Sequence, residues 1–190
     1  MTTVTTLDYL DHFASQSIFR LLLETLSRPG QIRQLEQTEL GALVLPLALG
    51  DVQTRIAICA SEEIQHDVVW ATGAVLTELD DADLVACCVG IDAGTIKRLR
   101  RGTALAPELG AKIAINCERL HADNSGALSL TLSGPGVNGS TTLGLDGLSR
   151  DVIDAIVEAN AHFPAGIDVW FIDQSGFVAA LPRSCRVEVR

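Results

Sequence analysis

Apolar residues recur at three- and four-residue spacing in several stretches of the chain, the pattern of an amphipathic helix. The first stretch covers residues 5–26, where Thr5 and Asp8 can form a capping box and Ser27-Arg28-Pro29-Gly30 ends the helix. Later helices are expected after side chains that can cap a helix start, at Ser61, Asp92 and Ser149.

Strands are predicted where apolar residues alternate with polar ones or form short continuous runs. The continuous run 84–89 is typical of a strand in a sheet that is covered on both faces. Asp173-Gln174-Ser175-Gly176 separates the last two strands and favours a hairpin. The segment Leu43–Leu49 stays unassigned because it is short and contains a proline. The predicted strands are residues 52–59, 84–89, 112–117, 128–132, 167–172 and 177–181.

Helical and strand patterns alternate along the whole chain, without an internal repeat or a linker. This alternation predicts a single α/β domain, residues 1–190, built as a sandwich with a mixed sheet. Gly134-Pro135-Gly136 is interpreted as a type II turn that closes a strand. A phosphate cradle is disfavoured there because proline has no N–H to donate.

The charge balance excludes a general nucleic-acid binder, since the chain has 14 Lys and Arg but 24 Asp and Glu, a net charge of −10. The amino end has no basic residue ahead of an apolar stretch, and the longest apolar runs are too short to cross a membrane. We therefore expect a cytoplasmic protein. The five cysteines include no C-x-x-C pair and are interpreted as reduced thiols that act as small apolar residues.

The sequence carries no motif that assigns a catalytic, cofactor-binding or metal-binding residue. The chain has no G-x-G-x-x-G, no lysine-bearing phosphate loop and no G-x-S-x-G, and its four histidines are scattered. Cys185 is the only thiol flanked by a cation, and we favour a structural role for it. The basic cluster from Lys97 to Arg101 is interpreted as a solvated helix face.

Five charged residues at predicted turns or element ends remain candidates for anion binding, acid–base work or an interface. Arginine clamps phosphate or carboxylate with two parallel hydrogen bonds, and loops and element ends are where functional groups are usually presented. For Arg20, Arg28 and Arg183 a structural role and an interface role stay open, and for Glu108 and Asp168 a structural role is favoured. The candidates are Arg20, Arg28, Arg183, Glu108 and Asp168.

Four groups of residues, in this order across nearly the whole chain, together resemble the PhnH family of the bacterial carbon-phosphorus lyase system. They are Gln16-x-x-Phe19-Arg20 with Ser27-Arg28-Pro29-Gly30; Arg101-Gly102-Thr103-Ala104-x-Ala106-Pro107-Glu108-x-Gly110-Ala111; Leu132-Ser133-Gly134-Pro135-Gly136; and Phe163-Pro164-x-Gly166-Ile167-Asp168 with Leu181-Pro182-Arg183. The family often has threonine where this chain has Ser184 and Cys185, so Cys185 is a weak candidate for shared chemistry.

This resemblance implies a three-layer α/β/α sandwich similar to the large domain of pyridoxal-phosphate-dependent transferases, without the cofactor. The implied role is a non-autonomous subunit that assists the transfer of a phosphonate to the ribose C1′ of ATP, with release of adenine. The implied partners are a second copy of the chain and the subunits PhnG, PhnI, PhnJ and PhnL. In that system PhnI resembles the catalyst and PhnJ later breaks the carbon-phosphorus bond.

The sequence leaves two alternatives to this role open. The subunit could hold nucleotide or phosphonate with its own arginines and use its own acid–base groups. It could also be a surviving pyridoxal-phosphate enzyme, which would need a desolvated lysine for the Schiff base. The chain has only Lys97 and Lys112, and neither sequence context suggests a buried amine. The family assigns no catalytic residue that can be carried over.

Overall fold

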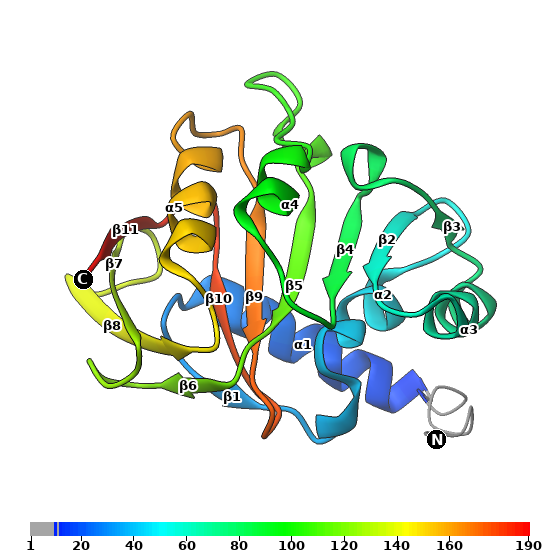
Figure 1. The fold of residues 1–190 in the computed structure, drawn as a ribbon, viewed down its shortest axis with the longest axis horizontal. Coiled ribbons are helices and arrows are strands. Elements are labelled where there is room, and N and C mark those ends of the chain that lie inside the picture. The colour runs from blue at the N-terminus through cyan, green and yellow to red at the C-terminus, as the bar shows by residue number, and fades with distance from the viewer. Residues whose placement is uncertain (1–9, 11) are drawn as a thin grey trace.

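The computed structural model describes residue 10 and residues 12–190 of the chain. In this part of the chain α-helices and β-strands alternate (Figure 1). The helices are α1 (His12–Ser27), α2 (Val44–Leu49), α3 (Glu62–Thr72), α4 (Ala93–Arg98) and α5 (Arg150–Ala159), and the 3-10 turns are η2 (Thr38–Leu43), η3 (Leu79–Asp81) and η4 (Pro107–Leu109). The strands are β1 (Arg33–Gln34), β2 (Arg55–Cys59), β3 (Val75–Leu76), β4 (Leu84–Cys87), β5 (Lys112–Asn116), β6 (Arg119–His121), β7 (Leu128–Ser133), β8 (Ser140–Asp146), β9 (Asp168–Ile172), β10 (Phe177–Leu181) and β11 (Arg186–Val189).

The main sheet is mixed and has the strand order β1-β10-β9-β5-β4-β2-β3. Strands β3, β2, β4, β5 and β9 run parallel, and β10 returns antiparallel beside β9. The chain visits β3 on one side of β2 and then crosses to β4 on the other side, so the strand order reverses between β2 and β4. All four residues of β4 are buried, as expected for a parallel strand that is covered on both faces.

A second, antiparallel sheet has the order β11-β7-β8-β6. Its inward leucines, such as Leu130 and Leu143, pack into the same apolar cluster as α4 and α5, on one face of the main sheet. The mixed α/β sheet is confirmed, but the single-sheet interpretation missed this second sheet. Most of β8 consists of small and polar residues, Ser140-Thr141-Thr142 and Gly144, which gave little apolar alternation to detect.

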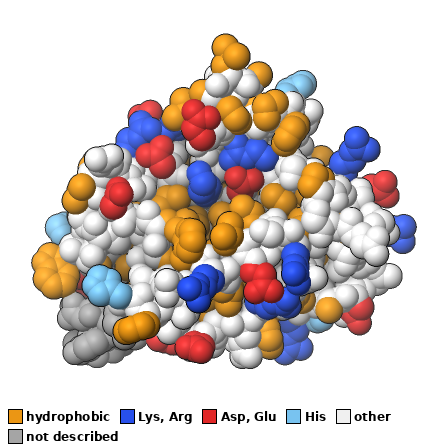
Figure 2. Space-filling model, turned by 180° about the vertical axis from the view of Figure 1, so that it is seen from behind, with side chains coloured by type: hydrophobic (Ala, Val, Ile, Leu, Met, Phe, Trp, Pro, Cys, Tyr) orange, Lys and Arg blue, Asp and Glu red, His pale blue; other side chains and the backbone are white. Residues whose placement is uncertain are grey.

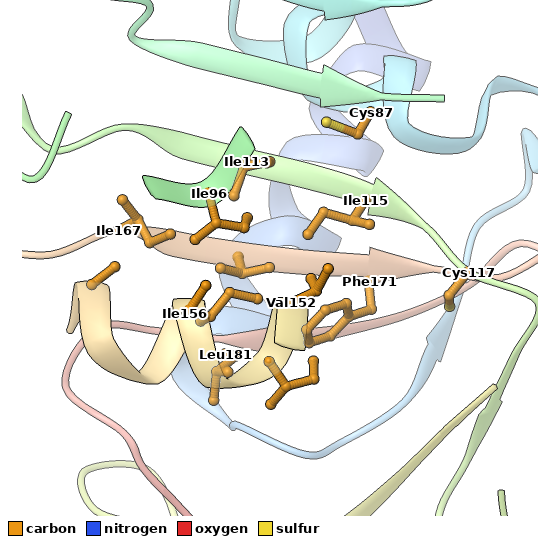
Figure 3. Packing of buried hydrophobic residues seen from close by; sticks show 14 of the residues in the cluster. Cys87, Ile96, Ile113, Ile115, Cys117, Val152, Ile156, Ile167, Phe171 and Leu181 are labelled. Atoms are coloured by element: carbon orange, nitrogen blue, oxygen red, sulfur yellow. The ribbon is translucent and has the colours of Figure 1, made fainter. Parts of the chain in front are cut away.

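The helices cover both faces of the main sheet, with α4 and α5 in front of it and α1 crossing behind it in the view of Figure 1. On the front face, Ile96 of α4 and Ile156 of α5 pack against Ile113, Ile115 and Phe171 of the sheet (Figure 3). Behind the sheet, buried residues of α1, α2 and α3 form a separate cluster with the alternate strand residues. Two apolar layers therefore hold the sheet.

Local signals explain most helix boundaries. The Ser61 hydroxyl accepts a hydrogen bond from the N–H of Ile64, and the Asp92 carboxylate accepts one from Thr95, which confirms both predicted caps. Helix α5 begins after Ser149 as expected, but the Ser149 side chain makes no cap hydrogen bond. Val152, Ile153 and Ile156 of this helix are buried, whereas Val157 is exposed. Leu43–Leu49, which the pattern left open, forms the end of η2 and helix α2.

Two further predictions concern the ends of the first helix and of the chain. Helix α1 ends at Ser27, as predicted, while the proposed capping residues Thr5 and Asp8 lie outside the described residues. Strands β9 and β10 form the predicted hairpin around residues 173–176. Among the described residues, no helix is long and apolar enough to cross a membrane.

Candidate functional site

The parallel strands begin at one edge of the main sheet, which we call the amino edge and define by Arg55, Asp83, Lys112 and Asp168. Asp83 precedes β4 and accepts hydrogen bonds from Arg55 at 2.9 and 3.1 Å and from Arg100 at 2.8 Å. Burial raises the pKa of the Asp83 carboxyl, but the hydrogen bonds from Arg55 and the charges of Arg55 and Arg100 lower it further than burial raises it. Asp83 therefore stays ionised and joins three segments at this edge.

Arg183 and Asp168 form the most buried ion pair of the amino edge, with side chains only 12% and 13% exposed. Arg183 Nη2 lies 2.7 Å from Asp168 Oδ2, and both Nε and the backbone N–H of Arg183 also donate to the carboxylate. Arg183 Nη1 donates to the carbonyl of Pro107. The pair thus clamps together the start of β9, the turn after β10 and residues 101–111, the loop that contains η4 and that we call the η4 loop. The Arg183 guanidinium donates its hydrogen bonds within the chain.

Glycines allow the backbone segments around this clamp to approach closely. A Cβ on Gly110 would lie 2.2 Å from the carbonyl oxygen of Gly166 and 2.6 Å from Nη1 of Arg183. A Cβ on Gly136 would lie 2.2 Å from the carbonyl oxygen of Ser27. No larger residue fits at either position without moving backbone, so the turn after α1, the η4 loop and the segments 134–136, 163–168 and 181–183 are built against one another.

The turn at residues 134–137 has the predicted type II form. The N–H of Val137 donates to the carbonyl of Gly134 at 3.1 Å, Pro135 occupies the second position, and Gly136 has φ +81°. The structural interpretation of this turn is confirmed.

A cleft of about 540 Å³ opens beside the clamp, between α5 and the segment that leads into β11. Ile156 and Val157 contribute apolar lining, and Arg183 and Arg186 contribute polar lining. Phe163, which also lines the cleft, is 66% exposed.

Further apolar side chains are exposed on the η4 loop, where Leu105 is 98% exposed and Leu109 is 46% exposed. The loop is tied to the segment of Phe163 by the hydrogen bond from Gly166 N–H to the carbonyl of Arg101, 2.7 Å long. We call Leu105, Leu109 and Phe163 the apolar patch. Figure 2 shows hydrophobic side chains gathered at the end of the molecule where the loop before β5 projects.

The five candidate residues from the sequence have different outcomes. Arg183 and Asp168 are brought together, but they bind each other, and this occupies the Asp168 carboxylate that an acid–base role would need. Glu108 lies in the neighbouring η4 turn and is exposed. Arg20 in α1 and Arg28 after it are exposed, and no hydrogen bond or ion pair among the described residues joins them to the clamp.

The opposite edge of the sheet, where the parallel strands end, is the usual ligand position in α/β proteins. A hollow of about 610 Å³ lies there, but two of its polar side chains, Asn116 and Asp173, bind backbone groups of the fold. Asn116 accepts the N–H of Ala42 at 2.7 Å and donates to the carbonyl of Cys88 at 3.2 Å. Asp173 accepts backbone N–H groups from Leu120, Ser175 and Phe177. We call this side the carboxyl edge and define it by Cys59, Cys87, Asn116 and Asp173.

Cys185 and three cations of the predicted basic cluster are held by contacts within the chain. Burial raises the pKa of the Cys185 thiol, which donates to the carbonyl of Ser133 at 3.3 Å, in line with the structural role expected for it. The interpretation of the basic cluster as a helix face was wrong in part, because α4 ends at Arg98. Three of its cations are ion-paired: Arg98 with Asp80, Arg100 with Asp83, and Lys97, at 3.9 Å, with Glu158. Within the described part of the chain no three His, Cys, Asp or Glu side chains are placed to hold a metal ion.

Sequence reasoning missed the apolar patch and the contact between Cys59 and Cys87. Leu105 carried a usable signal, because it is a large apolar residue inside a loop rich in Gly, Ala and Pro. The two cysteines carried none, since their contact depends on β2 and β4 being neighbours in register.

Fold and site together define an α/β protein in which segments distant in sequence meet at the amino edge, beside an exposed apolar patch. Comparison with known proteins gives the family. The family profile described as "Bacterial phosphonate metabolism protein (PhnH)" matches residues 10–188, and the chain belongs to this PhnH family.

Two relatives cover most of the chain. One is "Alpha-D-ribose 1-methylphosphonate 5-triphosphate synthase subunit PhnH" of Rhizobium meliloti (strain 1021), 26% identical over 93% of this chain and 91% of the relative. The other is "Putative C-P lyase subunit protein HtxG" of Stutzerimonas stutzeri, 28% identical over 92% of this chain and 86% of the relative. The resemblance seen in the sequence is thereby confirmed.

Proposed function

We propose that this chain is a non-autonomous subunit of a phosphonate-processing complex. In this proposal it assists the transfer of a phosphonate to the ribose C1′ of ATP, with release of adenine. The support is the Rhizobium relative, which is named as a subunit of an alpha-D-ribose 1-methylphosphonate 5-triphosphate synthase. We further propose a cytoplasmic location, a homodimer for the isolated chain, and PhnG, PhnI, PhnJ and PhnL as the subunits with which it assembles.

One observation carries this proposal: the segments that mark the family build a clamp whose polar groups are used inside the chain. Arg183 and Asp168 bind each other, and Gly110 and Gly136 pack against backbone. A catalytic site instead presents polar groups toward a substrate. Within the described residues, these segments hold the η4 loop and its exposed Leu105 in place, as a docking surface requires.

The apolar patch and the cleft beside it suit a protein partner. Exposed large apolar side chains that gather at one place are typical of interaction sites. The cleft offers the exposed Val157 and Phe163 to an apolar side chain, and Arg186 supplies an exposed cation at its rim. The partner that fits is a subunit of the complex that inserts an apolar side chain and carries a carboxylate next to it.

The docking surface is tested by changing the patch without touching the clamp. The double variant Leu105→Ser with Phe163→Ser should lower the affinity for a PhnG–PhnI complex by at least about tenfold, since central apolar contacts dominate interface energies. Trp70→Ser is the matched control, because Trp70 is 79% exposed on α3, which packs on the opposite face of the main sheet from α5 and the cleft. Equal affinity of both variants, with unchanged urea midpoints, would refute the docking surface.

The non-autonomous role is tested separately. The purified chain, incubated with ATP and methylphosphonate, should release no adenine, and release should appear when the partner subunits are added. Substantial adenine release by the chain alone would overturn this role and favour the alternative in which it binds and processes substrate itself. Calorimetric titration with ATP adds a direct measurement, since a private nucleotide site would release or absorb heat.

We also propose that the fold is related to the large domain of pyridoxal-phosphate-dependent transferases. Its support is the mixed sheet with parallel central strands and helices on both faces. For a working cofactor enzyme the lysines are poorly placed: Lys97 is 57% exposed on α4, and Lys112 begins β5 at the amino edge. Absorbance of the chain after soaking in pyridoxal phosphate, with and without both lysines, tests that alternative.

A further inference from the structure

Two cysteines lie side by side where the strand order of the main sheet reverses. Cys59 ends β2, Cys87 ends β4, and the two are direct partners in the parallel register. Their side chains are on the same face of the sheet, and the Cys87 thiol donates a hydrogen bond to the Cys59 sulfur at 3.4 Å. Neighbouring strands are about 4.8 Å apart, which falls within the range of about 4.4–6.8 Å that a disulfide bridges between Cα atoms.

The two thiols have different proton affinities, and a third thiol provides the contrast. The hydrogen bond from Cys87 lowers the pKa of the Cys59 thiol, although burial opposes this effect. The same hydrogen bond, burial and the nearby charge of Cys59 raise the pKa of Cys87. Cys88, the next residue along the chain, packs on the other face of the sheet, and burial raises its pKa to about 11. Cys59 is therefore the preferred nucleophile.

Cys59 is reachable by a small reagent, because it is half-buried and lines a hollow of about 510 Å³ between β2 and residues 76–79. Gln65 closes the wall of this hollow by donating to the carbonyls of Ile58 and Ala60. Glu78 also lines the hollow, so a neutral reagent should enter more readily than an anionic one.

We propose that Cys59 and Cys87 are a redox-active dithiol that closes to a disulfide by exchange with a small neutral disulfide. The Cys59 thiolate attacks one sulfur of the reagent, whose S–S bond breaks, and the leaving thiolate takes up a proton. Once Cys59 is bonded to the reagent, the negative charge and the hydrogen-bond acceptor of its thiolate no longer keep Cys87 protonated. Cys87 then loses its proton to water and attacks the Cys59 sulfur, releasing the second reagent thiol. Two protein thiols are oxidised, and one reagent disulfide is reduced to two thiols.

The inference is independent of the proposed function and concerns the carboxyl edge, away from the apolar patch. The new bond would join the ends of β2 and β4 and enclose the chain between them, which contains α3 and β3. Oxidation would thereby join β2, the neighbour of the edge strand β3, covalently to β4.

The test exposes the folded, full-length chain to bis(2-hydroxyethyl) disulfide, traps the remaining thiols with N-ethylmaleimide and maps the peptides. The wild type should lose two of its five thiols and yield a peptide pair linked through Cys59 and Cys87. Cys87→Ser should stop at a mixed disulfide on Cys59. Cys59→Ser should slow oxidation of Cys87 at least tenfold.

Cys88→Ser is the matched control and should form the same bond at the wild-type rate. A wild type that keeps all five thiols, a bond from Cys59 to Cys88, or an adduct on Cys59 that never resolves would each overturn the proposal. Urea midpoints check that the variants fold, and Cys87→Ala replaces Cys87→Ser if the serine variant does not. The wild-type peptide map decides the question even if both variants unfold.

Discussion

The parallel strands of the main sheet begin at one edge and end at the other, and the two edges carry different side chains. At the amino edge, Arg55, Asp83 and Asp168 are held in ion pairs, whereas the carboxyl edge ends in the thiols of Cys59 and Cys87 and in groups that cap backbone. Each arrangement satisfies the polar groups near it. They differ in what they connect, because Arg183, paired with Asp168, also donates to the carbonyl of Pro107 and so joins two groups of the family signature.

This difference indicates at which edge of the sheet the signature residues lie. The carboxyl edge is the usual ligand position of an α/β sheet, yet none of the four groups of signature residues contains the residues that define it. Signature residues such as Gly166, Asp168 and Arg183 lie at or beside the amino edge, and Gly166 and Arg183 contact the η4 loop. In this chain, then, these signature residues build the shape of one end of the molecule more than a set of reactive groups.

The largest effect is expected from adding one methyl group beside the amino edge, in Gly136→Ala. The new Cβ would lie 2.2 Å from the carbonyl oxygen of Ser27, and Gly136 has φ +81°, which L-residues rarely adopt. Strain in this backbone region costs about 1–2 kcal/mol and overpacking about 1–3 kcal/mol, so we expect a loss of about 3 kcal/mol in the free energy of unfolding. Urea denaturation measures it.

Gly139→Ala is the matched control for that variant. Gly139 has a similar φ, +75°, but a Cβ there would meet nothing within 4 Å. Only the backbone strain remains, so its loss should be about 1 kcal/mol. Equal losses in the two variants would mean that the close approach to Ser27 is not what holds the turn.

The clamp itself is tested by Asp168→Asn, which leaves the Arg183 guanidinium without its counter-charge. Because both side chains are nearly buried, the loss in unfolding free energy should be about 3 kcal/mol, as for other buried pairs that lose one partner. The matched control is Asp80→Asn, since Asp80 pairs with Arg98 at the surface and such pairs contribute less than about 1 kcal/mol. If Asp168→Asn lost no more free energy of unfolding than Asp80→Asn, the clamp would stabilise the fold no more than a surface ion pair does.

Sequence pattern alone predicted much of the main sheet, because its strands are apolar runs bounded by turn residues. The hairpin of β9 and β10 was predicted, and this hairpin is what brings Asp168 beside Arg183, but the pairing itself did not follow from spacing. Strand β8 was missed because its polar half, 140–142, masks the alternation. Contacts that depend on non-sequential neighbours, such as Cys59 with Cys87, require the strand order, which the pattern did not supply.

At the carboxyl edge, Asn116→Ala should cost less than breaking the clamp. The variant removes the acceptor of the N–H of Ala42, a fully buried residue, and the donor to the carbonyl of Cys88. An unsatisfied buried group costs about 1–3 kcal/mol, so we expect a loss of about 2 kcal/mol in urea denaturation. Asn124→Ala, in an exposed loop, should change stability by less than about 0.5 kcal/mol. If Asn116→Ala proved as mild as this control, the cap would contribute nothing.

The smallest effect concerns acid, and it separates the charged edge from the thiol edge. Asp83 has a pKa lowered in the folded state: burial opposes ionisation, but the hydrogen bonds and charges of Arg55 and Arg100 outweigh it. A lowered folded pKa contributes stability above the unfolded value of about 3.9, and this contribution is lost as the pH falls through the folded value. The wild type should therefore lose about 1 kcal/mol more than Asp83→Asn between about pH 6 and pH 3. The difference should shrink in about 1 M salt, because Arg55 is 40% exposed and its charge is screened there. If both proteins lost the same free energy of unfolding over this pH range, the arginines would not lower the pKa of Asp83 on folding. The ion pairs of the amino edge would then position loops without stabilising the sheet.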